Sequence, residues 1–225
     1  MALSKIDVAN MLTGEVPNAN VATIGVAKGG TGLTSGTSGQ FLKFTGSTTV
    51  ASSAVSGIDV ADHFRLTAST SAGTAGRIGS SSGAGGTFAK LTNMFSDTGS
   101  VTTGSDGGKF SFPKTGIYHV VVSMSGYNDT TDNDWSWSFE TTTNNFSSST
   151  EFGYVRCSVQ AASSSTPNNY IQSTGSLFMD VTDVSNVKFM LNTGSIASGN
   201  YFYGSSSGAD GKISSQVMIT RLADT

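Results

Sequence analysis

Three aspartates lie close together within residues 127–134, and they are the side chains best suited to metal chemistry. Asp129, Asp132 and Asp134 carry carboxylate oxygens, and Ca²⁺ takes about six to eight oxygen ligands. Their spacing is not that of an EF-hand loop. Asn and Asp are also the residues that turns between strands prefer. We favour a solvated turn here, keep a Ca²⁺ site as the alternative, and expect no other cofactor.

Two segments, residues 79–83 and 204–208, match the G-x-S-x-G pattern of a serine nucleophile. That motif functions only between a strand and a helix and beside a general base. The two histidines, His63 and His119, are the only candidates for the base, and His119 lies within a predicted strand. Chance matches are expected in a chain so rich in Gly and Ser. We therefore predict no catalytic site and no enzyme.

A pair of glutamates supplies the alternative from the enzyme class. Glu140 and Glu151 are the only glutamates after residue 86, and they flank an apparent turn at Asn144 and Asn145. A glycan hydrolase needs two carboxylates in a cleft. An assay of the purified protein on host polysaccharide would distinguish a hydrolase from an adhesion protein.

Three tyrosines are the predicted ligand-binding residues. Tyr201 and Tyr203 flank Phe202 in a segment bounded by glycines, and alternate residues of an extended segment point to opposite sides. At least one of these rings therefore faces away from the core. Tyr127 lies beside the aspartates. Exposed aromatic rings suit stacking on sugars or anchoring of a partner, and packing between subunits is the alternative.

These candidates must be positioned by strands. In residues 116–127 a period of two places Tyr118, Val120, Val122 and Met124 on one face. The opposite face is also apolar at its start. We therefore expect cover on both faces, by a second sheet or by a neighbouring subunit.

Further strand patterns follow at short intervals. In residues 134–140 the side chains of Trp135, Trp137 and Phe139 alternate with serines, which predicts an inward aromatic face. Four more segments have strand character: residues 152–159, 175–181, 186–192 and 213–222. Many short strands separated by Gly, Ser and Asn turns predict an all-β sandwich.

Composition excludes several classes of function. Charged residues make up 12% of the chain, against about 25% in an average soluble protein. The net charge of −3 leaves no basic surface for nucleic acid. Residues 1–7 lack the apolar core of a signal peptide, and no segment approaches the ~18 apolar residues of a membrane span. The single cysteine, Cys157, excludes a disulfide framework within the chain.

The glycine-rich segment 28–42 (KGGTGLTSGTSGQFL) carries the first resemblance. It resembles the "GGTG…GQ.L" stalk of bacteriophage tail-fibre proteins, and residues 9–21 have the same character. The resemblance implies short strands alternating with glycine turns in a fibre shaft, where glycine permits close backbone approach.

A second resemblance begins at residues 109–118 (KFSFPKTGIY), which is similar to the "G.F..P..G.Y" signature of the globular head of complement C1q. Residues 175–181 and 187–191 resemble the penultimate pair of strands in that family. The sequence departs from the family at 184–186, where Val-Ser-Asn replaces an acidic Gly-Asp. The resemblance implies a jelly-roll sandwich of the tumour-necrosis-factor type and a homotrimer.

These observations predict two regions: residues 1–86 for virion attachment, stalk and linker, and residues 87–225 for a jelly-roll head. Within the first region, residues 66–87 have too few large apolar groups for a core, which predicts a linker. The expected function is that of a homotrimeric virion fibre protein that is made in the host cytoplasm and mediates adhesion to the host cell surface. Its expected partners are two further copies of itself, another virion protein bound through the N-terminal region, and a host surface glycan or protein. The alternatives are a capsid head-fibre or decoration protein and, less favoured, a virion-associated glycan hydrolase. Nucleic-acid binding and membrane insertion are not expected.

Overall fold

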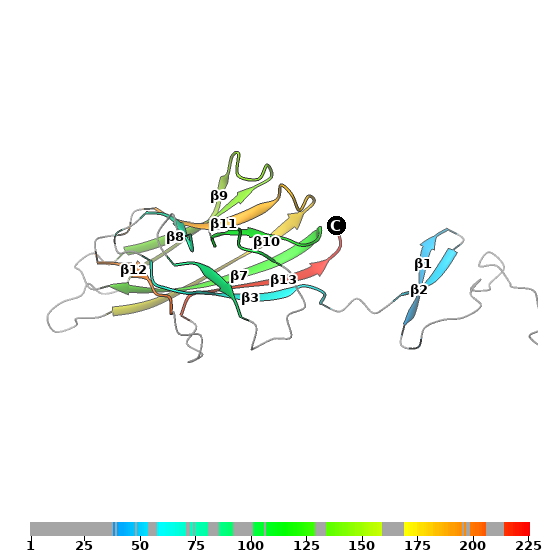
Figure 1. The fold of residues 1–225 in the computed structure, drawn as a ribbon, viewed down its shortest axis with the longest axis horizontal. Coiled ribbons are helices and arrows are strands. Elements are labelled where there is room, and N and C mark those ends of the chain that lie inside the picture. Colours follow the sequence, from blue (N-terminus) through cyan, green and yellow to red (C-terminus); the bar gives the residue numbers. More distant parts are fainter. Residues whose placement is uncertain are drawn as a thin grey trace, which may run out of the picture. The chain divides into compact units, whose positions relative to one another are not determined.

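The computed structural model divides into two compact units, Met1–Gly57 and Ile58–Thr225, each of which is described by itself. All the regular secondary-structure elements in the described part of the chain are β-strands (Figure 1). No helix among those residues is long and apolar enough to cross a bilayer. The described residues are 38, 40–47, 49–53, 58–70, 73, 75–80, 86–91, 101–105, 107–128, 134–158, 169–194, 196, 199–205 and 214–225.

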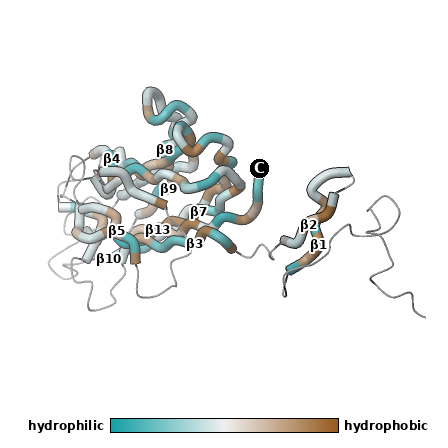
Figure 2. The backbone as a smooth tube through the Cα atoms, turned by 45° about the vertical axis from the view of Figure 1, so that its right-hand side comes forward, coloured by the Kyte–Doolittle hydropathy of each residue, from teal (hydrophilic) through white to brown (hydrophobic). Residues whose placement is uncertain are grey.

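The described part of the first unit is a β-hairpin. Strands β1 (Phe41–Gly46) and β2 (Thr49–Ser53) form an antiparallel two-stranded sheet. Three large side chains of β1 remain exposed, with Phe41 at 65%, Leu42 at 55% and Phe44 at 70%. Figure 2 shows these hydrophobic stretches in brown. The predicted stalk pattern before residue 38 lies outside the described residues.

The second unit, the head, contains two antiparallel sheets. The six-stranded sheet has the order β10 (Asn169–Val181), β7 (Gly116–Asn128), β13 (Gln216–Ala223), β3 (Ala61–Leu66) and β5 (Phe88–Lys90), with β12 (Tyr201–Phe202) paired to β7. The five-stranded sheet has the order β4 (Gly76–Ile78), β11 (Lys188–Thr193), β8 (Asp134–Thr142) and β9 (Thr150–Ser158), with β6 (Lys109–Ser111) paired to β11.

The chain crosses repeatedly between these sheets. It passes from β6 in the five-stranded sheet to β7 in the six-stranded sheet, and it returns to the five-stranded sheet for β8 and β9. It then crosses to β10, goes back to β11, and ends in the six-stranded sheet with β12 and β13. Two antiparallel sheets connected in this way form a jelly roll. The predicted all-β jelly-roll sandwich is therefore confirmed. Strands β10 and β11, which the sequence analysis treated as a pair, are consecutive but lie in opposite sheets.

The core lies between the two sheets, where the predicted alternation is confirmed. The inward residues of β7 (Tyr118, Val120, Val122, Met124) and β8 (Trp135, Trp137, Phe139) are all at most 1% exposed. Phe110 of β6 stacks on Phe189 of β11 with ring centroids 4.6 Å apart. Large aromatic rings from both sheets thus fill the interior.

The boundary of the head differs from the expected division at residue 86. Strand β3 lies between β13 and β5 in the six-stranded sheet, and its inward side chains Phe64 and Leu66 are 2% and 1% exposed. Strand β4 pairs with β11 and buries Ile78 completely. The N-terminal region expected at residues 1–86 therefore supplies two core strands, and β4 lies within the segment 66–87 that was expected to be a linker. These strands are short and lie among Gly, Ser and Thr, and their pairing partners are far away in the sequence.

The outer face of the six-stranded sheet is the face that points away from the five-stranded sheet. The sequence predicted cover on both faces, by a second sheet or by a neighbouring subunit. The five-stranded sheet covers one face, and cover of the other face by a subunit stays a prediction. On the outer face His119 and Val121 are half-buried. Phe178 of the neighbouring β10 is 67% exposed and stacks on His119, with ring centroids 4.6 Å apart. This face is therefore partly open within the described chain.

Candidate functional site

Four tyrosines gather at one end of this outer face. Tyr170 of β10 lies opposite Tyr127 of β7, and Tyr127 lies opposite Tyr201 of β12. Opposite residues of antiparallel strands project from the same face. The Tyr127 ring stacks on Tyr201 at 4.7 Å and meets Tyr170 edge-on at 5.1 Å, and Tyr203 meets Tyr170 edge-on at 6.3 Å. These four residues are called the tyrosine cluster below.

The inward neighbours explain why these rings project outward. Phe202, between Tyr201 and Tyr203, is 1% exposed and anchors β12 in the core. Gly126, opposite Phe202, leaves room for Trp135, because a Cβ at this position would lie 2.8 Å from the indole ring. The alternation predicted for the segment around Phe202 is thereby explained by packing.

Hydrogen bonds to the backbone of Tyr203 hold the end of β12 in place. The Tyr203 amide donates to the Ser125 carbonyl at 2.7 Å, and the Ser215 hydroxyl donates to the Tyr203 carbonyl at 2.7 Å. Tyr170 is 64% exposed and Tyr203 is 37% exposed. The cluster therefore presents two accessible rings from a fixed backbone.

A shallow groove of about 450 Å³ runs beside the cluster, lined by Ser125, Tyr170, Ile171, Gln172, Tyr203 and Ser214. Its polar groups are neutral. Gln172 donates to the Ser123 hydroxyl at 2.7 Å, and the Ser125 hydroxyl donates to the Ser214 carbonyl at 2.7 Å. Aromatic rings beside neutral hydrogen-bonding groups can stack on a sugar ring and bind its hydroxyls.

The structure brings together the three tyrosines selected from the sequence, Tyr127, Tyr201 and Tyr203, and adds Tyr170. The sequence analysis missed Tyr170 because it began the strand at residue 175, whereas β10 begins at Asn169. The sequence Tyr-Ile-Gln at 170–172 continues the alternation, and it was the available signal.

The predicted calcium ligands fall mostly outside the described residues. Asp129 and Asp132 are not described. Asp134 is the first residue of β8, and its Cα lies opposite that of Ser158. Within the described ranges no group of three His, Cys, Asp or Glu side chains is placed to hold a metal ion. The Ca²⁺ alternative at Asp129, Asp132 and Asp134 therefore stays a prediction.

The residues considered for catalysis are placed as follows. The central serines of the two nucleophile patterns, Ser81 and Ser206, lie outside the described residues. His63 Nε2 lies 2.7 Å from Gln216 Oε1, and His119 stacks on Phe178. Both histidines are thus engaged on the outer face of the six-stranded sheet.

Glu140 and Glu151 lie directly opposite each other on β8 and β9. Glu140 accepts hydrogen bonds from the Ser149 hydroxyl at 3.0 Å and from the Asn192 amide. The inward residue beside it is Phe139, so both glutamates face away from the core. Neither lines the groove beside the tyrosine cluster.

No protein-family model matches the sequence, and no curated protein matches it. Among solved structures, the chain is similar to the Eiger TNF from S. frugiperda. The two share 14% sequence identity, and the match covers 75% of this chain and 96% of that chain, with a TM-score of 0.49. A likeness at this level carries no functional argument, and the jelly-roll topology follows from the strand order itself.

Proposed function

We propose that this chain is a homotrimeric virion fibre protein whose jelly-roll head adheres to a neutral glycan on the host cell surface. The observation that carries the adhesive part is the tyrosine cluster, with Tyr170 and Tyr203 exposed beside a neutral groove. Tyr supplies a large, rigid contact area with a polar tip, which suits a ligand that has both a flat apolar face and hydroxyls.

The electrostatics of the groove favour a neutral ligand. Its described lining consists of serine, glutamine, tyrosine and isoleucine side chains, and none of these described residues is charged. An acidic glycan would gain no ion pair from these described residues. A single contact of this kind is weak, and three heads on one fibre raise the effective concentration of each successive contact.

Assembly into a trimer is supported by apolar surface that one copy leaves exposed. On the outer face of the six-stranded sheet, Phe178 is 67% exposed, and the half-buried Val121 lies opposite the half-buried Met218. In the hairpin, Phe41 and Phe44 are exposed on opposite faces. Exposed apolar patches of this kind mark association surfaces, and closed rotational symmetry would bring equivalent patches together.

The virion location rests on the resemblance of residues 28–42 to phage fibre stalks. Loops and strand ends on a rigid sandwich are common positions for binding residues, because they change without disturbing the core. A fibre that holds the particle through its N-terminal region and binds through its head fits this division.

Binding of the purified full-length protein to an array of neutral and acidic glycans tests the proposal. We expect retention of neutral glycans, and about tenfold weaker binding by Tyr170→Ala and by the Tyr201→Ala/Tyr203→Ala double variant. Tyr154→Ala is the matched control, because Tyr154 is 57% exposed but lies on β9 of the other sheet. Unchanged binding by the cluster variants, or loss of the trimer in them, would show that the tyrosines are packing residues.

A further inference from the structure

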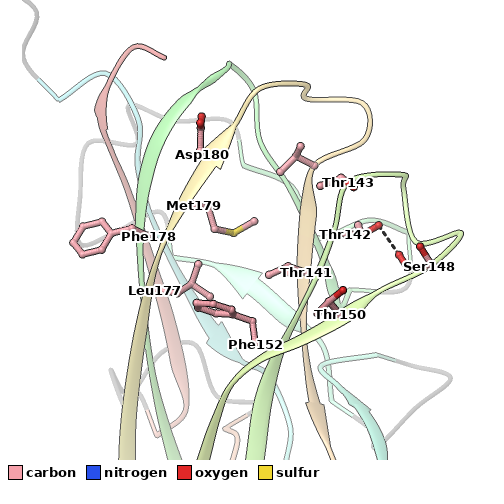
Figure 3. A pocket seen from close by; sticks show the side chains of 11 residues that line it. Thr141, Thr142, Thr143, Ser148, Thr150, Phe152, Leu177, Phe178, Met179 and Asp180 are labelled. Carbon is pink, nitrogen blue, oxygen red and sulfur yellow. Dashed lines mark hydrogen bonds between the residues drawn. The ribbon is translucent and has the colours of Figure 1, made fainter.

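A second pocket opens where the two sheets part, at the end of the head that carries the β8–β9 turn (Figure 3). Its volume is about 290 Å³, close to the lower end of the ~300–1,000 Å³ range of ligand pockets. That size suits one sugar ring. The residues that define this inter-sheet pocket are Thr141, Thr150, Phe152, Leu177, Met179 and Val187.

The floor of the inter-sheet pocket is apolar and fixed. Leu177, Met179 and Val187 are 5%, 6% and 6% exposed. Leu177 and Met179 lie opposite Val120 and Tyr118 of β7, so both point into the sandwich. A methyl group of a ligand that reached this floor would exchange water for close carbon contacts.

Phe152 forms an aromatic wall because of a β-bulge. The register of β8 and β9 shifts between Ser138 and Phe139, and Gly153, with φ of 69°, is the extra residue. Phe152 therefore lies opposite Phe139 on the core-facing side, yet it stays 56% exposed. Figure 3 shows its ring beside Leu177. Bulges often re-aim a side chain at a binding site.

Hydroxyl groups form the rim. The Thr142 hydroxyl is committed to the turn, because it lies 2.7 Å from the Ser148 carbonyl oxygen and accepts from the Asn144 amide at 3.1 Å. The hydroxyls of Thr141, Thr143 and Thr150, in contrast, have no hydrogen-bond partner among the described residues. Thr141 and Thr150 are opposite each other at the mouth. The rim thus offers free donors and acceptors above an apolar floor.

We propose that the inter-sheet pocket binds a neutral N-acetylated hexose residue. The acetyl methyl contacts Leu177 and Met179, the sugar ring lies against Phe152, and the Thr141 and Thr150 hydroxyls bind the acetamido group and ring hydroxyls. Asp180 is the one charged residue in the described lining, so an anionic sugar gains no partner there. This proposal rests on the proposed glycan-binding function and adds a second subsite, away from the tyrosine cluster.

Saturation-transfer NMR on the full-length protein with N-acetyl-D-glucosamine as the probe tests this subsite. We expect the strongest transfer at the acetyl methyl, and about tenfold weaker binding of D-glucose, which lacks the acetamido group. Phe152→Ala should weaken binding of N-acetyl-D-glucosamine about fivefold to tenfold. Tyr154→Ala is the matched control. It lies two residues along the same strand, opposite Ser138 and on the other face, and should bind as the parent does.

Two measurements keep this outcome separate from that of the proposed function. Tyr170→Ala should leave binding of N-acetyl-D-glucosamine in the pocket unchanged, and the melting temperature of Phe152→Ala should match that of the parent. Equal affinity for the two sugars, or parent-like binding by Phe152→Ala, overturns the subsite. A fall in assembly mass in Phe152→Ala also overturns it, because a second copy of the chain would then occupy the pocket.

Discussion

The hairpin and the head use similar strand sequences and reach opposite degrees of burial. In the hairpin, Phe41 and Phe44 are 65% and 70% exposed, whereas in the head Phe64, Phe110 and Phe139 are at most 2% exposed. The difference is the second layer. A sheet buries its apolar face only when another layer covers it, and the head has two sheets whereas the hairpin has one.

This contrast separates what one chain can stabilise from what requires an assembly. A two-stranded hairpin is marginally stable in water, and Phe41 and Phe44 have no cover in the described part of their own unit. The head, with a continuous aromatic core, is large enough to fold alone. We infer that assembly, rather than local packing, orders the hairpin.

The largest effect on folding is expected when a fragment of the head begins after β3 and β4 instead of before them. A fragment of residues 58–225 should melt cooperatively at the temperature of the head in the full chain. A fragment of residues 87–225 should not fold, because it lacks β3 and β4 and therefore the buried Phe64, Leu66 and Ile78. Thermal unfolding followed by circular dichroism compares the two fragments. Cooperative melting of the fragment 87–225 would contradict the claim that the head needs β3 and β4 in order to fold.

A pair of single substitutions sharpens the same comparison. Trp137→Ala should reduce the free energy of unfolding of the head by about 3–5 kcal/mol. Trp137 is fully buried, and its Nε1 donates to the Ser173 hydroxyl at 2.9 Å. Phe44→Ala in the hairpin should change head stability by less than about 0.5 kcal/mol. Denaturant titration measures both, and equal effects would contradict the separation.

The smallest effect on stability is expected at Asp59, which pairs with Lys114 and Arg221. A hydrogen bond from the Lys114 ammonium at 2.9 Å, opposed by partial desolvation and aided by Arg221, holds the pKa of Asp59 below its ordinary value of 3.8. A carboxyl with a depressed pKa stabilises the fold above its unfolded pKa, and it loses this contribution as the pH falls through the folded value. Because the Asp59 side chain is 39% exposed and solvent screens its ion pairs, the contribution is small.

Asp59→Asn should therefore lower head stability slightly at pH 6 and leave it unchanged at pH values below the folded pKa of Asp59. Thermal unfolding of both proteins across pH 2–7 gives the comparison. A difference that grows on acidification would contradict the direction of this pKa shift.

Much of the head could be predicted because its long strands alternate cleanly. Strands β7 and β8 carry large apolar residues at every second position, and a period of two is sufficient to assign their inward faces. The jelly-roll topology was reached through the resemblance of residues 109–118, since periodicity alone gives no strand order.

Strands β3 and β4 could not be predicted because their stability is non-local. Residues 61–66 are stabilised by pairing with β13, which is about 150 residues away, and Ile78 is buried beneath β11. The positions of Tyr170 and Phe152 in their proposed binding sites could not be predicted for a similar reason. The first depends on where β10 begins, and the second depends on a bulge at Gly153 that changes which face its neighbours occupy.

The mass of the full-length protein in solution tests the central claim most directly. The homotrimer that we propose would cover both the exposed hairpin side chains and the partly open face of the six-stranded sheet. Light scattering at micromolar concentration should give about three times the 23.0 kDa mass of one chain. A mass of one chain would contradict the account, because both apolar surfaces would then face water.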